Sequence, residues 1–130
     1  MLDTNIVSYI HNHHTIAALY EPHLVGVKAL VSFQTVAEMR FGAKTAGWGI
    51  RRLQELEITL AEYTVVHTDD LLVNRWGIVR AKTLKIGRHI DLADAWIAAT
   101  ALEFDIPLVT HNARDFSFVE GLVLITEKEV

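Results

Sequence analysis

Short runs of branched apolar residues alternate along the chain with segments of helical periodicity. The apolar runs lie at Val27–Val31, Tyr63–His67, Pro107–Thr110 and Leu122–Ile125, and helical patterns fill most of the intervals between them. Two of the runs contain the continuous apolar segments "KALVS" and "IPLVT", which are typical of parallel strands buried on both faces. The pattern therefore predicts an α/β fold in which helices cover a parallel sheet.

Three polar side chains mark the expected starts of helices. Asn5, Ser32 and Thr68 each precede a segment of helical periodicity, and each can accept a hydrogen bond from a backbone N–H of the first turn. We therefore expect these three residues to be N-caps.

The segment "HIDLADAWIAATALEFD", residues 89–105, predicts a helix that is apolar on nearly all sides but carries Asp91 and Asp94 at its start. The first turn is therefore expected to lie inside the protein, where a carboxylate needs a cation, several hydrogen-bond donors or both. Only one of the two acids needs to face a pocket, because Asp91 can instead cap the helix.

The composition limits the class of protein. With 130 residues, 51% of them hydrophobic, and only 7 Gly and 2 Pro, we expect one compact domain over residues 1–130. The chain has no Cys, which excludes thiolate metal sites and makes a reducing cytoplasm the expected location. No window of about 18 uninterrupted apolar residues occurs, so we expect no association with a membrane.

Positive charge is concentrated in one part of an acidic chain. The net charge is −4, yet Leu71–Ile90 contains five basic residues and no acidic one. The apolar stripe of this predicted helix consists of Leu72, Trp76, Val79, Thr83 and Ile86. The basic residues are thereby left on the solvent side, either as an ordinary solvated surface or as a track for nucleic-acid phosphates.

Four acidic residues lie shortly after predicted strands or near predicted helix starts. They are Asp3, Glu38, Asp94 and Asp115. Each alone has an ordinary explanation as a helix cap, an exposed helix residue or a turn former. Parallel α/β sheets bind ligands beyond the carboxyl ends of their strands, however, and four carboxylates that converge there require a divalent cation. Oxygen ligands favour Mg²⁺ or Mn²⁺ over zinc, and such an ion supports the hydrolysis of a phosphodiester.

Four segments in order resemble PIN domains, specifically the VapC-type ribonuclease toxins of toxin-antitoxin pairs. "LDTNIVSYI" is similar to the family's opening Asp-Thr-Asn segment, and "VSFQTVAEMRFGA" is similar to its second block, which carries a Glu. "DLADAWIAATAL" and "IPLVTHNARDF" are similar to the third and fourth blocks. The similarity covers nearly the whole chain, and four blocks at domain spacing are far more specific than any one of them.

The resemblance implies a three-layer α/β/α sandwich and metal-dependent endonucleolytic cleavage of RNA. It implies that Mg²⁺ or Mn²⁺ is bound by Asp3, Glu38, Asp94 and Asp115. Asp91 is a candidate for supporting these ligands. Thr110 and Asn112 match the family's Thr-x-Asn pair, whose hydroxyl and amide are expected to bind a ligating carboxylate or the scissile phosphate. The implied partners are an RNA substrate, an antitoxin that inserts a basic side chain into the site, and a second copy in a homodimer.

On this interpretation the basic segment Arg75–Arg88 becomes an RNA track. Arg80, Lys82 and Lys85 are its expected phosphate contacts, and removing their charge is expected to weaken RNA binding and its dependence on salt. Further basic residues assigned to the mouth of the site from charge alone are Arg40, Lys44 and Arg114.

The start of the chain departs from the family pattern. Only Met1 and Leu2 precede Asp3, whereas the family's first strand normally carries several apolar residues before its Asp. Either the true start lies upstream or the central strand of the sheet is short.

Other hypotheses agree less well with the residues. His11, His13 and His14 lack the ligand spacing of a zinc site. An aspartyl-phosphate phosphatase would carry Asp at position 5, where this chain has Asn, and a receiver domain would carry Lys where Thr110-His111 stands. Two alternatives stay open: a PIN nuclease of RNA processing without an antitoxin, and a degenerate PIN domain that binds RNA or protein without cutting.

Overall fold

The computed structural model describes residues 1–128, whose helices and strands follow the predicted alternation. The helices are α1 (Thr4–His11), α2 (Ala17–Leu24), α3 (Phe33–Thr45), α4 (Ile50–Leu60), α5 (Asp70–Lys85) and α6 (Leu92–Glu103), with a 3₁₀ turn η1 (Ala113–Asp115). The strands are β1 (Leu30–Ser32), β2 (Thr64–Val66), β3 (Leu108–Val109) and β4 (Leu124–Ile125). Within the described range, no helix is long and apolar enough to cross a membrane.

The strands form two parallel pairs that the N-terminal residues join. β1 pairs with β2 and β3 pairs with β4, so that Val31 lies opposite Val65 and Val109 lies opposite Ile125. Leu2 makes parallel bridges to both Val31 and Val109, which gives the spatial order β2, β1, Leu2, β3, β4. The central position of the sheet is thus occupied by the residue directly before Asp3.

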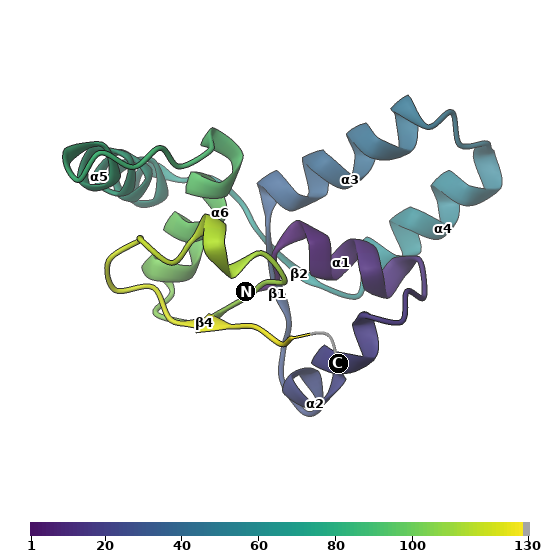
Figure 1. The fold of residues 1–130 in the computed structure, drawn as a ribbon. Coiled ribbons are helices and arrows are strands. Elements are labelled where there is room, and N and C mark those ends of the chain that lie inside the picture. The colour runs from purple at the N-terminus through teal and green to yellow at the C-terminus, as the bar shows by residue number, and fades with distance from the viewer. Residues whose placement is uncertain (129–130) are drawn as a thin grey trace.

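Successive residues of the sheet point to opposite faces and into two separate cores. Met1 and Leu108 belong to the core under α5 and α6, whereas Leu2 and Val109 belong to the core under α1, α3 and α4. Figure 1 shows these two groups of helices on opposite sides of the strands. The predicted α/β/α sandwich is therefore confirmed, and the period-two alternation of the strands produces it.

Helices α5 and α6 pack along each other as their apolar patterns predict. Leu72, Val79 and Thr83 of α5 are buried, but Ile86, expected on the same stripe, is 61% exposed because the helix ends at Lys85. Residues 97–101 of α6 are all buried, and the many alanines of this helix permit close approach to its neighbours.

Only one of the three predicted N-caps is correct. The hydroxyl of Ser32 caps α3. Asp3 caps α1 in place of Asn5, and Asp69 caps α5 in place of Thr68. Aspartate accepts first-turn hydrogen bonds as well as Asn or Thr does, so an adjacent Asp can displace either of them as the cap.

The first predicted strand begins too early. Val27 is 58% exposed, and parallel pairing starts only at Leu30. Gly26, with φ of 73°, belongs to the turn that follows α2, and the chain needs the residues after this turn to reach the sheet.

Candidate active site

The carboxyl edge of the sheet gathers acidic side chains from distant parts of the chain. Asp3 follows the central bridge, and Thr110 follows β3. The remaining acids come from the elements beside this edge: Glu38 from α3, Asp94 from the first turn of α6 and Asp115 from η1. Parallel strands all end at one edge, so the topology alone brings these segments together.

A cavity of about 660 Å³ at this edge is lined by all four acids. The other polar residues that line it are Thr4, Asn5, Ser8, Asn12 and Asn112. Its apolar side is formed by α3 and the turn after α3, through Met39, Phe41, Gly42, Ala43 and Trp48. The structure therefore brings the predicted acids together in one cavity.

Asp3 is the most enclosed of the four acids, with 6% of its surface exposed. Its Oδ1 accepts from the backbone N of Thr4 at 2.8 Å, and its Oδ2 accepts from Thr110 Oγ1 at 2.7 Å. Burial raises the pKa of Asp3, these two hydrogen bonds oppose the rise, and the charges of Glu38 and Asp115 add to it. The side chain is thus fixed in place and surrounded by like charge.

Asp94 shows most clearly that the acids crowd one another. Burial, the larger cause, and the charges of neighbouring carboxylates together raise its pKa to about 7. These neighbours are Asp3, Asp91, Asp115 and Glu38. The first turn of α6 is less enclosed than expected, since Leu92 is 56% exposed and Asp94 is only partly buried. Like charge as well as burial therefore acts on Asp94.

The donor set of the cavity fits a hard divalent cation. All four candidate ligands are carboxylates, and within residues 1–128 none of them forms an ion pair with Lys, Arg or His. No three acidic or His side chains of that range stand close enough together to coordinate an ion as they are. Asp3 is bound to Thr110, and Glu38 accepts from Gln34 Nε2 at 3.1 Å. The oxygen chemistry fits Mg²⁺ or Mn²⁺, and binding would require some of these side chains to rotate towards the ion.

Comparison with known families agrees with this arrangement of acids. The model of the PIN domain matches residues 1–122. The chain belongs to the PIN-domain family. The predicted resemblance is thereby confirmed, and the blocks on which it rests supply the four acids of the cavity.

The chain is also similar to curated VapC proteins over most of its length. Ribonuclease VapC2 of Haemophilus influenzae is 32% identical over 122 residues, which cover 94% of this chain and 92% of that protein. The tRNA(fMet)-specific endonuclease VapC of Shigella flexneri is 29% identical over 122 residues, with the same two coverages of 94% and 92%. The VapC type that the four blocks predicted is thus confirmed.

Solved structures share the fold. VapBC-1 from nontypeable Haemophilus influenzae matches with a TM-score of 0.81 and 27% identity, over 97% of this chain and 96% of that one. VapBC2 from Rickettsia felis, solved with a DNA fragment from the promoter, matches with a TM-score of 0.87 and 24% identity over 98% of both chains. The second likeness shows the PIN fold alone.

Thr110 and Asn112 of this PIN domain both lie at the acidic edge. Thr110 is fully buried, donates its hydroxyl hydrogen to Asp3 and accepts from the backbone N of Asn112 at 3.0 Å. Asn112 also lines the cavity. Sequence reasoning missed Asn5, which lines the same cavity and whose Oδ1 accepts from the backbone N of His111 at 3.4 Å. Asn5 is the third residue of the Asp-Thr-Asn segment, and this position in the motif could have identified it as a site residue.

Asp91 occupies the N-cap position of α6, but its side chain accepts no capping hydrogen bond, so the alternative that its carboxylate caps the helix is wrong. Its side chain instead lies beside a neighbouring cavity of about 370 Å³, together with Asp94, Arg88 and Arg114. Asp91 therefore acts on the PIN site through its charge, which raises the pKa of Asp94.

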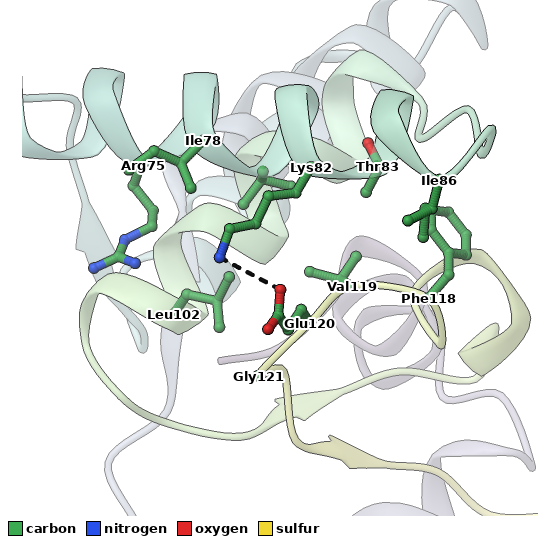
Figure 2. A pocket seen from close by; sticks show the side chains of 11 residues that line it. Arg75, Ile78, Lys82, Thr83, Ile86, Leu102, Phe118, Val119, Glu120 and Gly121 are labelled. Atoms are coloured by element: carbon green, nitrogen blue, oxygen red, sulfur yellow. Dashed lines mark ion pairs between the residues drawn. The ribbon is translucent and has the colours of Figure 1, made fainter.

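The cations predicted as phosphate contacts, Arg80, Lys82 and Lys85, do not line either of the acidic cavities. Arg80 stacks over Trp76 at 5.3 Å from the ring centroid, and Lys82 Nζ lies 3.4 Å from Glu120 Oε2. Figure 2 shows Lys82 reaching across a groove from α5 to Glu120. Lys85 ends the same helix and is exposed. As RNA contacts these residues stay a prediction, whereas Arg88, at the end of the same basic segment, lies beside the acids.

The basic residues assigned to the mouth of the site differ in position. Arg114 lines the neighbouring cavity beside Asp94 and Asp115. Arg40 is engaged elsewhere, because its guanidinium donates to Glu57 at 2.7 and 3.2 Å. Charge alone could not predict that Arg114 lies beside the acids and Arg40 does not, because the partner of Arg40, Glu57, lies on another helix.

The histidines near the N-terminus have structural contacts. His11 Nδ1 lies 2.9 Å from Thr59 Oγ1, and His14 Nδ1 accepts from the backbone N of Ile16 at 3.1 Å. These bonds tie the end of α1 to α4 and shape the turn before α2.

Proposed function

We propose that the protein is an endoribonuclease that hydrolyses RNA phosphodiester bonds with Mg²⁺ or Mn²⁺. The observation that carries the proposal is that Asp3, Glu38, Asp94 and Asp115, from four separate segments, line one cavity. Membership of the PIN family supports a nuclease, and the ribonucleases that the chain resembles over 94% of its length support RNA as the substrate.

The four carboxylates are the groups that would hold the ion, which supplies an activated water and neutralises charge on the leaving oxygen when bound. Thr110 holds one oxygen of Asp3, and the first turn of α1 holds the other, so Asp3 is presented in one orientation. Asn112 lies on the cavity wall, where its amide can bind the scissile phosphate. Arg88 and Arg114 lie beside the acids, where their charges can attract the RNA backbone.

Two other functions are consistent with the fold: a PIN nuclease of RNA processing without an antitoxin, and a binding module without catalysis. The presence of all four acids supports catalysis over binding alone, because crowded carboxylates without a function would only destabilise the fold. The similarity to VapC proteins supports the toxin over the processing enzyme.

Cleavage of structured RNA, followed with and without Mg²⁺, tests the proposed chemistry. We expect the wild type to cut in Mg²⁺ or Mn²⁺ and to stop in EDTA, and Asp94→Asn to lose at least about 100-fold in rate. Asp105→Asn is the matched control, because Asp105 is an exposed acid just beyond the other end of α6 and should leave the rate unchanged. Cutting that persists in EDTA or in Asp94→Asn would refute the proposed site.

We further propose that the protein is the toxin of a type II pair and forms a homodimer. The solved relative at 27% identity carries the name of a VapBC pair, which supports an antitoxin as partner. We expect a small neighbouring gene that encodes a DNA-binding protein with a basic tail. The product of this gene should stop RNA cleavage when it is added. Light scattering of the purified protein tests the dimer.

A further inference from the structure

The cavity of the acids has an exposed aromatic ring on its apolar side. Phe41 lies on α3 three residues after Glu38, so both side chains project from the same face of the helix. Both line the cavity, and Phe41 is 67% exposed. Single exposed apolar residues are common on protein surfaces, but this one stands beside the acids.

Gly42, next to Phe41, leaves the cavity open at that point. Glycine is a poor helix former, yet Gly42 lies within the last turn of α3. A Cβ placed there would meet no atom within 4 Å, so packing does not require glycine at this position. The missing side chain instead adds open space to the cavity that Phe41 also lines.

The part of the cavity wall that α1 contributes is polar. Ser8 and Asn12 of the α1 end line the same cavity, and Asn12 Nδ2 donates to Ser8 Oγ at 3.3 Å. A hydroxyl and an amide together offer both donors and acceptors, which is what the edge of a nucleobase requires.

Trp48 also lines the cavity, but other groups engage its ring. The guanidinium of Arg52 lies 4.0 Å from the ring centroid, and the His11 ring lies at 5.8 Å. Within residues 1–128, no aromatic ring or cation stacks on Phe41. Phe41 is therefore the aromatic residue of this cavity whose ring is open to a ligand.

We propose that Phe41 and the open space at Gly42 form a seat for one unpaired base of the RNA, next to the phosphate held at the acids. This inference rests on the proposed function. A base on an aromatic ring is held mainly by stacking, which every base provides and purines provide most strongly. A paired base in a helix is not free to stack there, so the RNA must be single-stranded at the cleavage position.

Binding of short oligonucleotides to a non-cleaving protein tests the seat. In the Asp94→Asn background we expect oligoadenylate containing 2-aminopurine to bind with quenched fluorescence, more tightly than oligouridylate and more tightly than duplex RNA. Adding Phe41→Leu is expected to weaken the oligoadenylate complex about tenfold and to remove the quenching. Phe41→Trp should retain both, and Gly42→Leu, which fills the open space, should weaken binding as Phe41→Leu does.

Phe104→Leu is the matched control for Phe41→Leu. Phe104 is another half-exposed phenylalanine, at the C-terminal end of α6 and outside the acidic cavity, so its substitution should leave RNA binding unchanged. Circular dichroism and thermal melting of every variant check that the fold is intact.

Equal binding of oligoadenylate by folded Phe41→Leu and its parent would overturn the inference. It would also be overturned if Phe41→Leu changed only the oligomeric state or the binding of a protein, which would make this surface a protein contact. A wild type that cuts no RNA refutes the proposed nuclease instead, while quenching that depends on Phe41 would still support the seat.

Discussion

The acidic cavity and the basic face of α5 differ in how the fold satisfies their charges. Within the described residues, the four acids of the cavity have no ionic partner, and the pKa of Asp94 rises to about 7. On α5, Arg75 binds Glu103 at 2.9 Å and Lys82 lies 3.4 Å from Glu120. Within residues 1–128, the fold therefore supplies ionic partners for these two cations but none for the four carboxylates.

This difference indicates where function lies. Exposed ion pairs contribute little to stability, so the cations of α5 can be replaced at small cost. Crowded, partly buried carboxylates destabilise the folded state unless something binds them. The acids that the fold leaves without an ionic partner are therefore better candidates for a site than the paired cations of α5.

Loss of the Thr110 hydroxyl is the strongest test of how the cavity is supported. Thr110→Val removes the hydrogen bond to Asp3 Oδ2 and leaves that oxygen without its fixed donor. We expect cleavage to fall by about 10- to 100-fold, as for other residues that orient metal ligands, while Thr110→Ser retains most of the activity.

Thr83→Val provides the comparison on α5. Thr83 is equally buried, but its hydroxyl donates only within its own helix, to the carbonyl of Arg80 at 3.1 Å. Its substitution should leave kcat and KM unchanged. If Thr83→Val and Thr110→Val reduced cleavage equally, the effect would reflect general stability instead of the orientation of Asp3.

The sequence was sufficient for the layers of the fold and for the acids, because both follow from periodicity and from the blocks of the PIN family. Buried runs of apolar residues predicted the strands, and the carboxyl-edge rule predicted where acids from separate blocks meet. The missed N-caps at Asp3 and Asp69 show the limit of local reasoning, since adjacent residues compete for the same first-turn donors.

The roles of the basic residues could not be predicted in the same way. Whether Lys82 or Arg88 faces the acids depends on tertiary packing, which places Glu120 beside one and Asp91 and Asp94 beside the other. The position of Phe41 at the cavity could not be predicted for the same reason. In a helix of mixed polarity, only the folded structure shows that this ring is exposed on the cavity of Glu38.

Removal of the Asp94 charge tests the crowding through stability. The pKa of the Asp94 carboxyl rises from 3.8, the ordinary value of an aspartate, to about 7 in the folded protein without metal. The folded state therefore holds the proton more tightly, and metal-free protein should lose stability as pH rises from about 4 to about 7. Because Asp94 is only partly buried, we expect Asp94→Asn to recover about 1–2 kcal/mol above this window and little below it.

Denaturant unfolding at both ends of the pH window measures this effect, with Asp105→Asn as the exposed control. Mg²⁺ should stabilise the wild type above pH 7 and stabilise Asp94→Asn less, since a bound ion offsets the repulsion. Parallel pH profiles for the wild type and Asp94→Asn would show that the Asp94 carboxyl is not perturbed.

The smallest expected effect distinguishes the two sets of cations. Arg88 and Arg114 lie beside the acids, so Arg88→Gln and Arg114→Gln should each reduce the slope of log K for single-stranded RNA against log salt by about 0.7. Lys82→Gln and Lys85→Gln change the same charge on α5, away from the acids, and should reduce the slope less. Equal reductions would restore α5 as part of the RNA track. A larger reduction from the α5 pair would show that the RNA backbone runs along this helix. In that case Lys82 would exchange its partner Glu120 for an RNA phosphate on binding.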